Sequence, residues 1–243
     1  MSIKWQPASH PATETPPASS SPVFADFGSD KLTVSAGVAI FHLASSRVVV
    51  CRHSKDRYWF LPKGRRDASE DSGAGAEREG FEESGYRNRL LPIPLRHRQP
   101  RPHNTPSKDL SPFVTEPIWT QLIPQTSASQ YILFWYIAET IPPDTDNSPI
   151  DVDADPPSVP QPYQPPVKYP SHMTLSARVA LEPMGYEPVH HENTGVDSEE
   201  AFYVSYLMPI PEAAQKLQGT IQEQVVVGGW EAICRRWKME DGS

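Results

Sequence analysis

Three glutamates in the segment from Gly64 to Tyr86 are spaced so that they could bind a metal ion together. Glu79, Glu82 and Glu83 stand at positions i, i+3 and i+4, and in a helix of about 3.6 residues per turn their side chains share an arc of about 100°. Like charges at this spacing destabilise a helix, so they call for a compensating partner. A divalent cation that prefers oxygen ligands is such a partner. A solvated acidic helix face is the alternative interpretation.

The residues around these glutamates suit a helix that presents them. Asp71 or Ser72 can cap its start, and Phe81 points away from the carboxylates and can anchor the helix to a core. Arg78 lies about 100° around the helix and can orient a carboxylate from the flank. Gly75 falls on the carboxylate face one turn earlier, where we expect it to leave room for a ligand.

The length of 243 residues predicts one domain with tails or inserts. Proline, with 28 residues, is about twice as frequent as in an average chain. Its richest stretches predict a disordered tail over residues 1–30, a long surface loop over about 99–117 and a disordered insert over about 141–172. A folded domain over 31–243 contains the two internal segments, which could also bind protein partners.

The charge and the apolar pattern exclude several classes of protein. A net charge of -8 argues against binding of nucleic acid through counterion release. No apolar run reaches the roughly 18 residues of a membrane span, and no secretory signal is visible in Met1–Pro22. Cys51 and Cys234 suit free thiols in a reducing compartment. These features predict a protein of the cytoplasm, with the nucleus as a further location, and no membrane partner.

The remaining elements follow from hydrophobic patterns. Strands are predicted at Ala36–Leu43 and Arg47–Arg52 as a hairpin, at Tyr58–Leu61, at Gln130–Glu139 with both faces buried, and at Ala201–Met208. Helices are predicted at Pro211–Leu217 and Ile221–Trp237, and the second carries a stripe of Val226, Trp230, Ile233 and Trp237. Because Gly228 and Gly229 weaken its first half, a start after this pair is the alternative. The order of elements is typical of an α/β sandwich.

The acidic segment as a whole follows the spacing GX5EX7REUXEEXGU, where U is a bulky apolar residue, and its fixed positions are Gly64, Glu70, Arg78, Glu79, Glu82, Glu83 and Gly85. It resembles the signature of the Nudix hydrolase family, and the preceding WFLPKG is similar to the strand-to-loop entry common in that family. Gly80 departs from the pattern because it occupies the first U position. Either Phe81 fills the vacated space or the helix lies closer to its neighbour.

The resemblance implies an α/β (α+β) fold of the Nudix type, an α/β/α sandwich around a mixed β-sheet. It also implies an enzyme that hydrolyses a diphosphate linkage with Mg²⁺ or Mn²⁺. The implied metal ligands are Glu82, Glu83, Glu79 and the carbonyl of Gly64. The implied catalytic residues are Glu79 as ligand or base, Arg78 to orient Glu79, and Glu70 to pair with Arg78 and fix the loop.

Other residues are candidates for substrate contact or for an extra carboxylate. Lys63, Arg65 and Arg66 lie at the mouth of the expected site and are predicted to bind phosphate. A basic stretch follows the box, and a solvated loop is the favoured interpretation of Arg87, Arg89, Arg96, His97, Arg98, Arg101, His103 and Lys108. In the family an additional carboxylate outside the box often completes the metal site. Candidates are Glu139, Glu199 and Glu200, with a plain surface position favoured for each.

Three functions are compatible with the sequence. The first is a metal-dependent hydrolase of a nucleoside diphosphate-linked or other phosphorylated small molecule, such as a dinucleoside polyphosphate or a diphosphoinositol polyphosphate. The second is a non-catalytic Nudix-like module that senses a ligand or acts as a protein-interaction scaffold. The third is an RNA-directed pyrophosphohydrolase, which the charge of -8 disfavours. Because every carboxylate of the box is present, the first function is preferred.

Overall fold

The computed structural model describes residues 19–100, 111–143 and 162–242 of the chain. In chain order they form β1 (Leu32–His42), β2 (Arg47–His53), β3 (Trp59–Phe60), β4 (Lys63–Arg65), α1 (Ser72–Ser84), β5 (Asn88–Leu90), β6 (Trp119–Pro124), β7 (Gln130–Thr140), α2 (Leu175–Val179), the 3₁₀ helix η3 (Glu200–Phe202), β8 (Tyr203–Pro209), α3 (Ile210–Lys216) and α4 (Ile221–Asp241). No helix in these described ranges has the length and apolar character needed to cross a membrane.

The strands form one mixed sheet with β1 at its centre. The main path is β3-β2-β1-β7-β5, while β4 pairs with β1, β6 with β7 and β8 with β2. Only β1 and β7 are parallel among the named pairs, with Leu32 opposite Gln130 and Phe41 opposite Glu139. The predicted hairpin of β1 and β2 is confirmed, with Phe41 opposite Val48. The sequence missed the short strands β4 and β5, and also β6.

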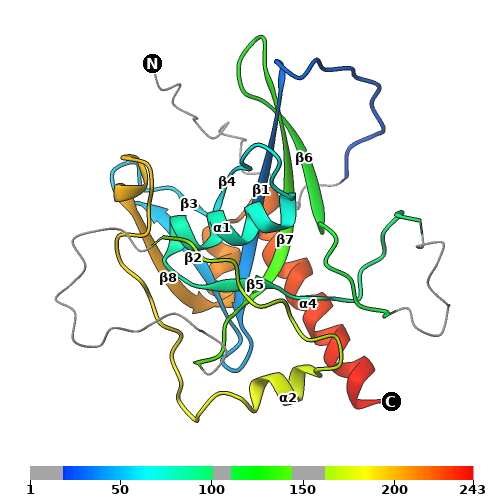
Figure 1. Ribbon diagram of the computed structural model, residues 1–243, viewed down its shortest axis with the longest axis vertical. Helices are drawn as coiled ribbons and strands as arrows, with labels where there is room; N and C mark the ends of the chain where they lie inside the picture. The colour runs from blue at the N-terminus through cyan, green and yellow to red at the C-terminus, as the bar shows by residue number, and fades with distance from the viewer. Residues whose placement is uncertain (1–18, 101–110, 144–161, 243) are drawn as a thin grey trace.

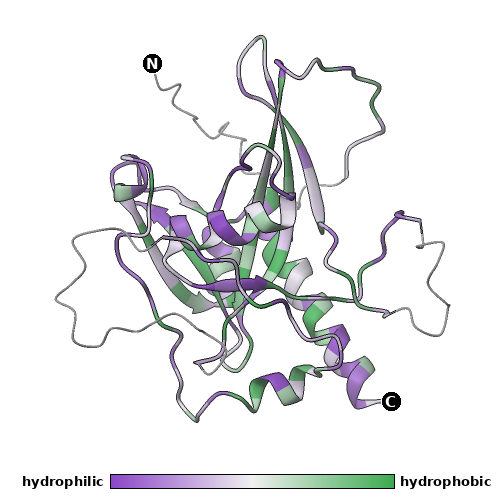
Figure 2. Ribbon diagram, viewed as in Figure 1, coloured by the Kyte–Doolittle hydropathy of each residue, from purple (hydrophilic) through white to green (hydrophobic). Residues whose placement is uncertain are grey.

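Helices cover both faces of this sheet, which confirms the predicted α/β/α sandwich (Figure 1). On one face Val38, Ile40 and Tyr136 pack toward α1, and on the other Phe41 and Ile137 belong to the core that α3 and α4 complete. Successive residues of a strand point to opposite faces, so β1 and β7 contribute to both cores. Figure 2 shows apolar residues concentrated in these central strands, whereas α1 is mainly polar.

Helix α4 begins at Ile221 as predicted and runs through the glycine pair, so the alternative start after Gly229 is wrong. A side chain at Gly229 would overlap Ile137 and approach Phe41 Cε2 to 3.2 Å, because the helix lies close to the sheet there. Gly228 faces more open space, with Ile118 Cδ1 at 3.5 Å. Tertiary contact with the sheet outweighs the weak helix propensity of glycine.

The interpretation of 141–172 as a disordered insert is wrong for its two described parts, residues 141–143, where Ile141 is buried, and residues 162–172. Tyr169 is buried in the core against the face of the sheet that α4 covers, and its hydroxyl donates a hydrogen bond to the Met173 carbonyl at 3.2 Å. Proline-rich chain can pack in this way because one aromatic anchor buries enough apolar surface to hold it. Residues 144–161 of the insert, 101–110 of the predicted loop and 1–18 of the predicted tail lie outside the described ranges.

Strand β8 begins two residues later than predicted. Glu200–Phe202 forms η3 instead, and the Ser54 amide donates to the Phe202 carbonyl at 2.7 Å. The chain therefore turns sharply before entering the sheet beside β2. This turn brings the Glu200 carboxylate close to those of Glu79 and Glu83 on α1.

Candidate active site

Helix α1 is capped at its start by Asp71 and at its end by Gly85. The Asp71 side chain accepts hydrogen bonds from the amides of Gly73 and Ala74, which confirms the predicted cap. At the other end Gly85 adopts a left-handed conformation (φ 71°), and its amide donates to the Phe81 carbonyl. Phe81 is buried and contacts the His191 ring. The helix thus presents its glutamates from a fixed position.

Three carboxylates gather beside this helix. Glu79 and Glu83 of α1 and Glu200 of η3 each offer an oxygen within 4.8 Å of the other two. Glu79 has 7% of its surface exposed, and the Glu83 side chain accepts a hydrogen bond from the Lys63 amide at 2.7 Å. An all-oxygen donor set with three negative charges fits a hard divalent cation such as Mg²⁺ or Mn²⁺.

Their electrostatics favour a positively charged partner. Burial raises the pKa of Glu83 from its ordinary 4.5 to about 8, opposed by Lys63 and reinforced by Glu79. Burial also raises the pKa of Glu79 to about 7, although Arg78 acts to lower it. Both carboxylates are therefore costly to ionise without a cation, and a bound cation would displace their protons.

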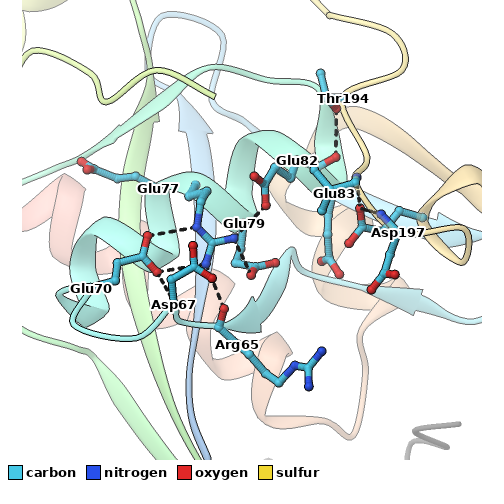
Figure 3. Close-up of polar contacts among 12 residues, drawn as sticks. Arg65, Asp67, Glu70, Glu77, Glu79, Glu82, Glu83, Thr194 and Asp197 are labelled. Carbon is cyan, nitrogen blue, oxygen red and sulfur yellow. Dashed lines mark hydrogen bonds and ion pairs between the residues drawn. The ribbon is translucent and has the colours of Figure 1, made fainter. Parts of the chain in front are cut away.

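Arg78 links the carboxylates that flank this group. Its guanidinium donates two hydrogen bonds to Glu70, both at 2.9 Å, and further bonds to Glu79 at 2.9 Å and Glu82 at 2.8 Å (Figure 3). It also donates to the Arg65 carbonyl at 2.9 Å. Burial acts to raise the pKa of Glu70, but the hydrogen bonds from Arg78 and the Asp67 amide leave it below its ordinary value. The network ties the loop before α1 to the helix.

Glu82 lies outside the group of three. Its Oε2 accepts the bond from Arg78, while its backbone carbonyl accepts a hydrogen bond from the Thr194 hydroxyl at 2.9 Å (Figure 3). Burial raises the pKa of its carboxyl, with Arg78 opposing the shift. The bond to Arg78 engages one oxygen, so the other can still serve as a ligand.

Glycines allow the close approaches that the site requires. At Gly64 a side chain would overlap the Glu79 carboxylate, so only glycine lets β4 pass beside it. At Gly80 an added Cβ would lie 2.8 Å from Val38 Cγ1, so α1 sits close to β1, the second of the two expected outcomes. The prediction that Gly75 leaves room for a ligand is wrong, because a Cβ there would be 3.0 Å from Glu70 Oε2 and 3.2 Å from Arg66 Cβ.

The three predicted phosphate-binding residues occupy different surroundings. The Arg65 side chain is exposed and points away from the carboxylates in Figure 3. The Arg66 guanidinium donates to the Glu70 carbonyl at 2.6 Å and so braces the loop. The Lys63 ammonium lies 5.1 Å from the centre of the Phe60 ring. Arg65 is therefore the most accessible to a ligand of the three.

The interpretation of the basic stretch as a solvated loop is wrong for its first part. Arg89 is buried and donates to Glu139 at 2.7 Å, and Arg87 lies over the Phe81 ring at 5.6 Å. Arg96, His97 and Arg98 are exposed as expected, and Arg101, His103 and Lys108 lie outside the described residues. An internal ion pair accounts for Arg89, and a contact with the Phe81 ring accounts for Arg87.

Of the three candidates for an extra carboxylate, the structure brings only Glu200 to the glutamates of α1. Glu139 is fully buried between Arg89 and Arg178, so the favoured surface position is wrong for it. Glu199 instead contacts His53 Nε2 at 3.2 Å. No local signal distinguishes Glu200 from its neighbour, because its place depends on the turn before β8.

The family model of the NUDIX domain matches residues 31–151. No curated protein matches the chain. Similar solved structures include a NUDIX hydrolase from Nitrosomonas europaea, with 10% identity, a TM-score of 0.43 and coverage of 83% of this chain and 90% of that chain.

Two others have comparable coverage. A NUDIX family hydrolase from Clostridium perfringens has 15% identity and a TM-score of 0.40, with 83% of this chain and 95% of that chain covered. An Ap4A hydrolase from C. elegans, solved as a binary complex, has 13% identity and a TM-score of 0.40, with 84% and 98% covered. The matched residues 31–151 contain the whole acidic box, and this part of the chain is a NUDIX domain.

Proposed function

We propose that this protein is a Mg²⁺- or Mn²⁺-dependent hydrolase that cleaves a diphosphate linkage in a phosphorylated small molecule. A nucleoside diphosphate-linked compound, a dinucleoside polyphosphate or a diphosphoinositol polyphosphate is the proposed type of substrate. The observation that carries the proposal is the convergence of Glu79, Glu83 and Glu200 beside the box helix.

The proposed ligands are Glu79, Glu83 and Glu200, with Glu82 and the Gly64 carbonyl as additional oxygen donors. A divalent cation held there would neutralise the charge of a diphosphate, orient its oxygens and lower the pKa of an attacking water. Positioning and charge stabilisation account for most of phosphoryl transfer catalysis, so a set of carboxylates is chemically sufficient.

Other steps of the proposed reaction are assigned to side chains of this site. Glu79 is proposed as a ligand or as the base, because a bound cation would keep its buried carboxylate ionised and able to accept a proton from water. Arg78 holds Glu79 Oε1 at 2.9 Å and Glu70 at the same distance, so it fixes the direction of the Glu79 carboxylate. Arg65, exposed beside this network, is proposed to contact an outer phosphate.

A panel of diphosphate compounds assayed with each metal tests the proposal. Dinucleoside polyphosphates, diphosphoinositol polyphosphates and nucleotide sugars are incubated with the full chain and Mg²⁺ or Mn²⁺, and phosphate-containing products are measured. We expect turnover of at least one compound, lost in Glu83→Gln and in Glu82→Gln.

Glu77→Gln is the matched control. Glu77 lies on the same helix, but its carboxylate accepts a hydrogen bond from the Leu90 amide at 2.7 Å and points away from Glu79 and Glu83 (Figure 3). Turnover in this variant should match that of the wild type. Absence of turnover with every compound and both metals would favour the ligand-sensing or scaffold function.

A further inference from the structure

Glu200 is the one member of the carboxylate group that does not belong to α1. Its Oε2 accepts hydrogen bonds from the amides of Val196 at 2.6 Å and Asp197 at 3.1 Å. The loop before η3 therefore folds around this carboxylate and fixes its direction. Because the loop is otherwise exposed, the position of Glu200 depends on how the loop and η3 are attached to the domain.

The loop is attached to α1 at one end. Thr194 is buried, and its hydroxyl donates to the Glu82 carbonyl at 2.9 Å (Figure 3). Slightly earlier, the His191 amide donates to the Gly85 carbonyl at 2.8 Å. These bonds hold the start of the loop at the carboxyl end of the box helix.

At the other end, η3 is attached to the end of β2 through His53. Only 1% of the His53 surface is exposed, and its ring stacks on Tyr58 with centroids 5.2 Å apart. The Asp56 amide donates to Nδ1 at 2.9 Å, so Nδ1 is an acceptor and the neutral ring carries its proton on Nε2. Nε2 lies 3.2 Å from Glu199 Oε1 and donates to it.

We propose that His53 is a positioning residue of the metal site, acting through Glu199 to hold the turn that presents Glu200. The proposal rests on the proposed function, since it takes Glu200 to be a ligand. Glu199 immediately precedes Glu200, so a hydrogen bond to its side chain limits the rotation of the whole turn. The bond from the Ser54 amide to the Phe202 carbonyl at 2.7 Å holds the same turn from its far side.

The hydrogen bonds of His53 argue against a second metal site formed by His53, Asp56 and Glu199. His53, Asp56 and Glu199 also bring ligand atoms within 4.8 Å of one another, as a metal site would. Both ring nitrogens are already engaged, however, one by the Asp56 amide and the other by Glu199. A metal ion there would have to displace both bonds, whereas Glu79 and Glu83 lie in a separate group with Glu200.

Binding of Mn²⁺ alone to the full chain, measured from the electron paramagnetic resonance signal of free Mn²⁺, tests the proposal without turnover. Glu199→Gln and Glu199→Ala remove the same charge, but only glutamine keeps an oxygen that can accept from His53. Because the Glu199 side chain is 60% exposed, neither change threatens the core. His53→Phe keeps an aromatic ring beside Tyr58 and removes the donor.

We expect Glu199→Ala to bind Mn²⁺ about threefold to tenfold more weakly than Glu199→Gln, the range expected for loss of one hydrogen bond. His53→Phe should weaken binding similarly, and His53→Phe combined with Glu199→Ala should be no weaker than the weaker single variant. The melting temperatures of Glu199→Ala and Glu199→Gln should agree within about 2 °C.

Equal affinities of the two Glu199 variants would overturn the proposal, because charge alone would then explain the effect. Additive effects in the double variant would also overturn it. Loss of one bound Mn²⁺ at saturation in Glu199→Ala would show that the His53 cluster is itself a metal site. If the wild type binds Mn²⁺ but hydrolyses no compound, the proposed function fails, while the comparison of Mn²⁺ affinities still decides the role of His53. If the wild type binds no Mn²⁺, both the proposed function and the proposed role of His53 fail.

Discussion

Replacing Glu83 by glutamine should stabilise the metal-free protein above neutral pH while removing its response to metal. Burial raises the pKa of Glu83 from 4.5 to about 8 in the folded chain. Below the lower value both the folded and the unfolded states hold the proton, and Glu83 carries no penalty. As pH rises toward 8 the unfolded state releases the proton and the folded state retains it, so the free energy of unfolding falls.

The magnitude follows from this shift. Each pH unit between the two pKa values lowers the stability by about 1.4 kcal/mol, so the change from about pH 6 to pH 8 amounts to roughly 2–3 kcal/mol. For a chain of this size that is a difference of about 4–12 °C in melting temperature. Glutamine does not ionise, and its side-chain oxygen can still accept the bond from the Lys63 amide, which is 2.7 Å long in the wild type.

Thermal melts in EDTA at both pH values, repeated with Mn²⁺, provide the measurement. The wild type should lose more stability than Glu83→Gln between the two pH values, and only the wild type should be strongly stabilised by Mn²⁺. Glu77→Gln is the control, because burial raises the pKa of Glu77 to about 7 at a position outside the carboxylate group. It should flatten the pH dependence and keep the response to Mn²⁺.

Two results would refute this reasoning. If the melting temperatures of Glu83→Gln and the wild type decline in parallel with pH, Glu83 does not retain its proton in the folded chain. If Mn²⁺ stabilises Glu83→Gln as much as the wild type, Glu83 is not a ligand. Either result can be read without knowing the substrate.

Arg65→Ala should raise KM about tenfold with little change in kcat or melting temperature, and an unchanged KM would exclude a phosphate contact. Arg66→Ala should instead lower the melting temperature, because the hydrogen bond from its guanidinium to the Glu70 carbonyl is lost. Glu139→Ala should reduce the free energy of unfolding in urea by about 3–5 kcal/mol, because it removes the buried carboxylate that Arg89 and Arg178 share, although Arg178 keeps its ion pair with Glu182. Mn²⁺ affinity should not change. Gly228→Ala should stabilise α4 by up to about 1 kcal/mol, whereas Gly229→Ala should destabilise the fold by about 1–3 kcal/mol through overlap with the sheet. Thermal melts in which Gly229→Ala is the more stable of the two variants would show that α4 does not lie against the sheet.

The sequence by itself determined the chemistry of the helix and the class of fold. The spacing of Glu79, Glu82 and Glu83, the Asp71 cap and the apolar strands are local patterns, because each depends on residues within one or two turns or on strand alternation. The family resemblance rests on the same short segment. These features could be read without any knowledge of distant contacts.

Only the tertiary structure decided which carboxylate joins the box. Glu139, Glu199 and Glu200 have the same side chain, yet one is paired with buried arginines, one contacts His53 and one joins Glu79 and Glu83. Their roles depend on contacts between segments far apart in the chain, which no local pattern encodes. The path of α4 through Gly229 was decided in the same way, because the space left by a missing side chain has meaning only once a neighbour occupies it.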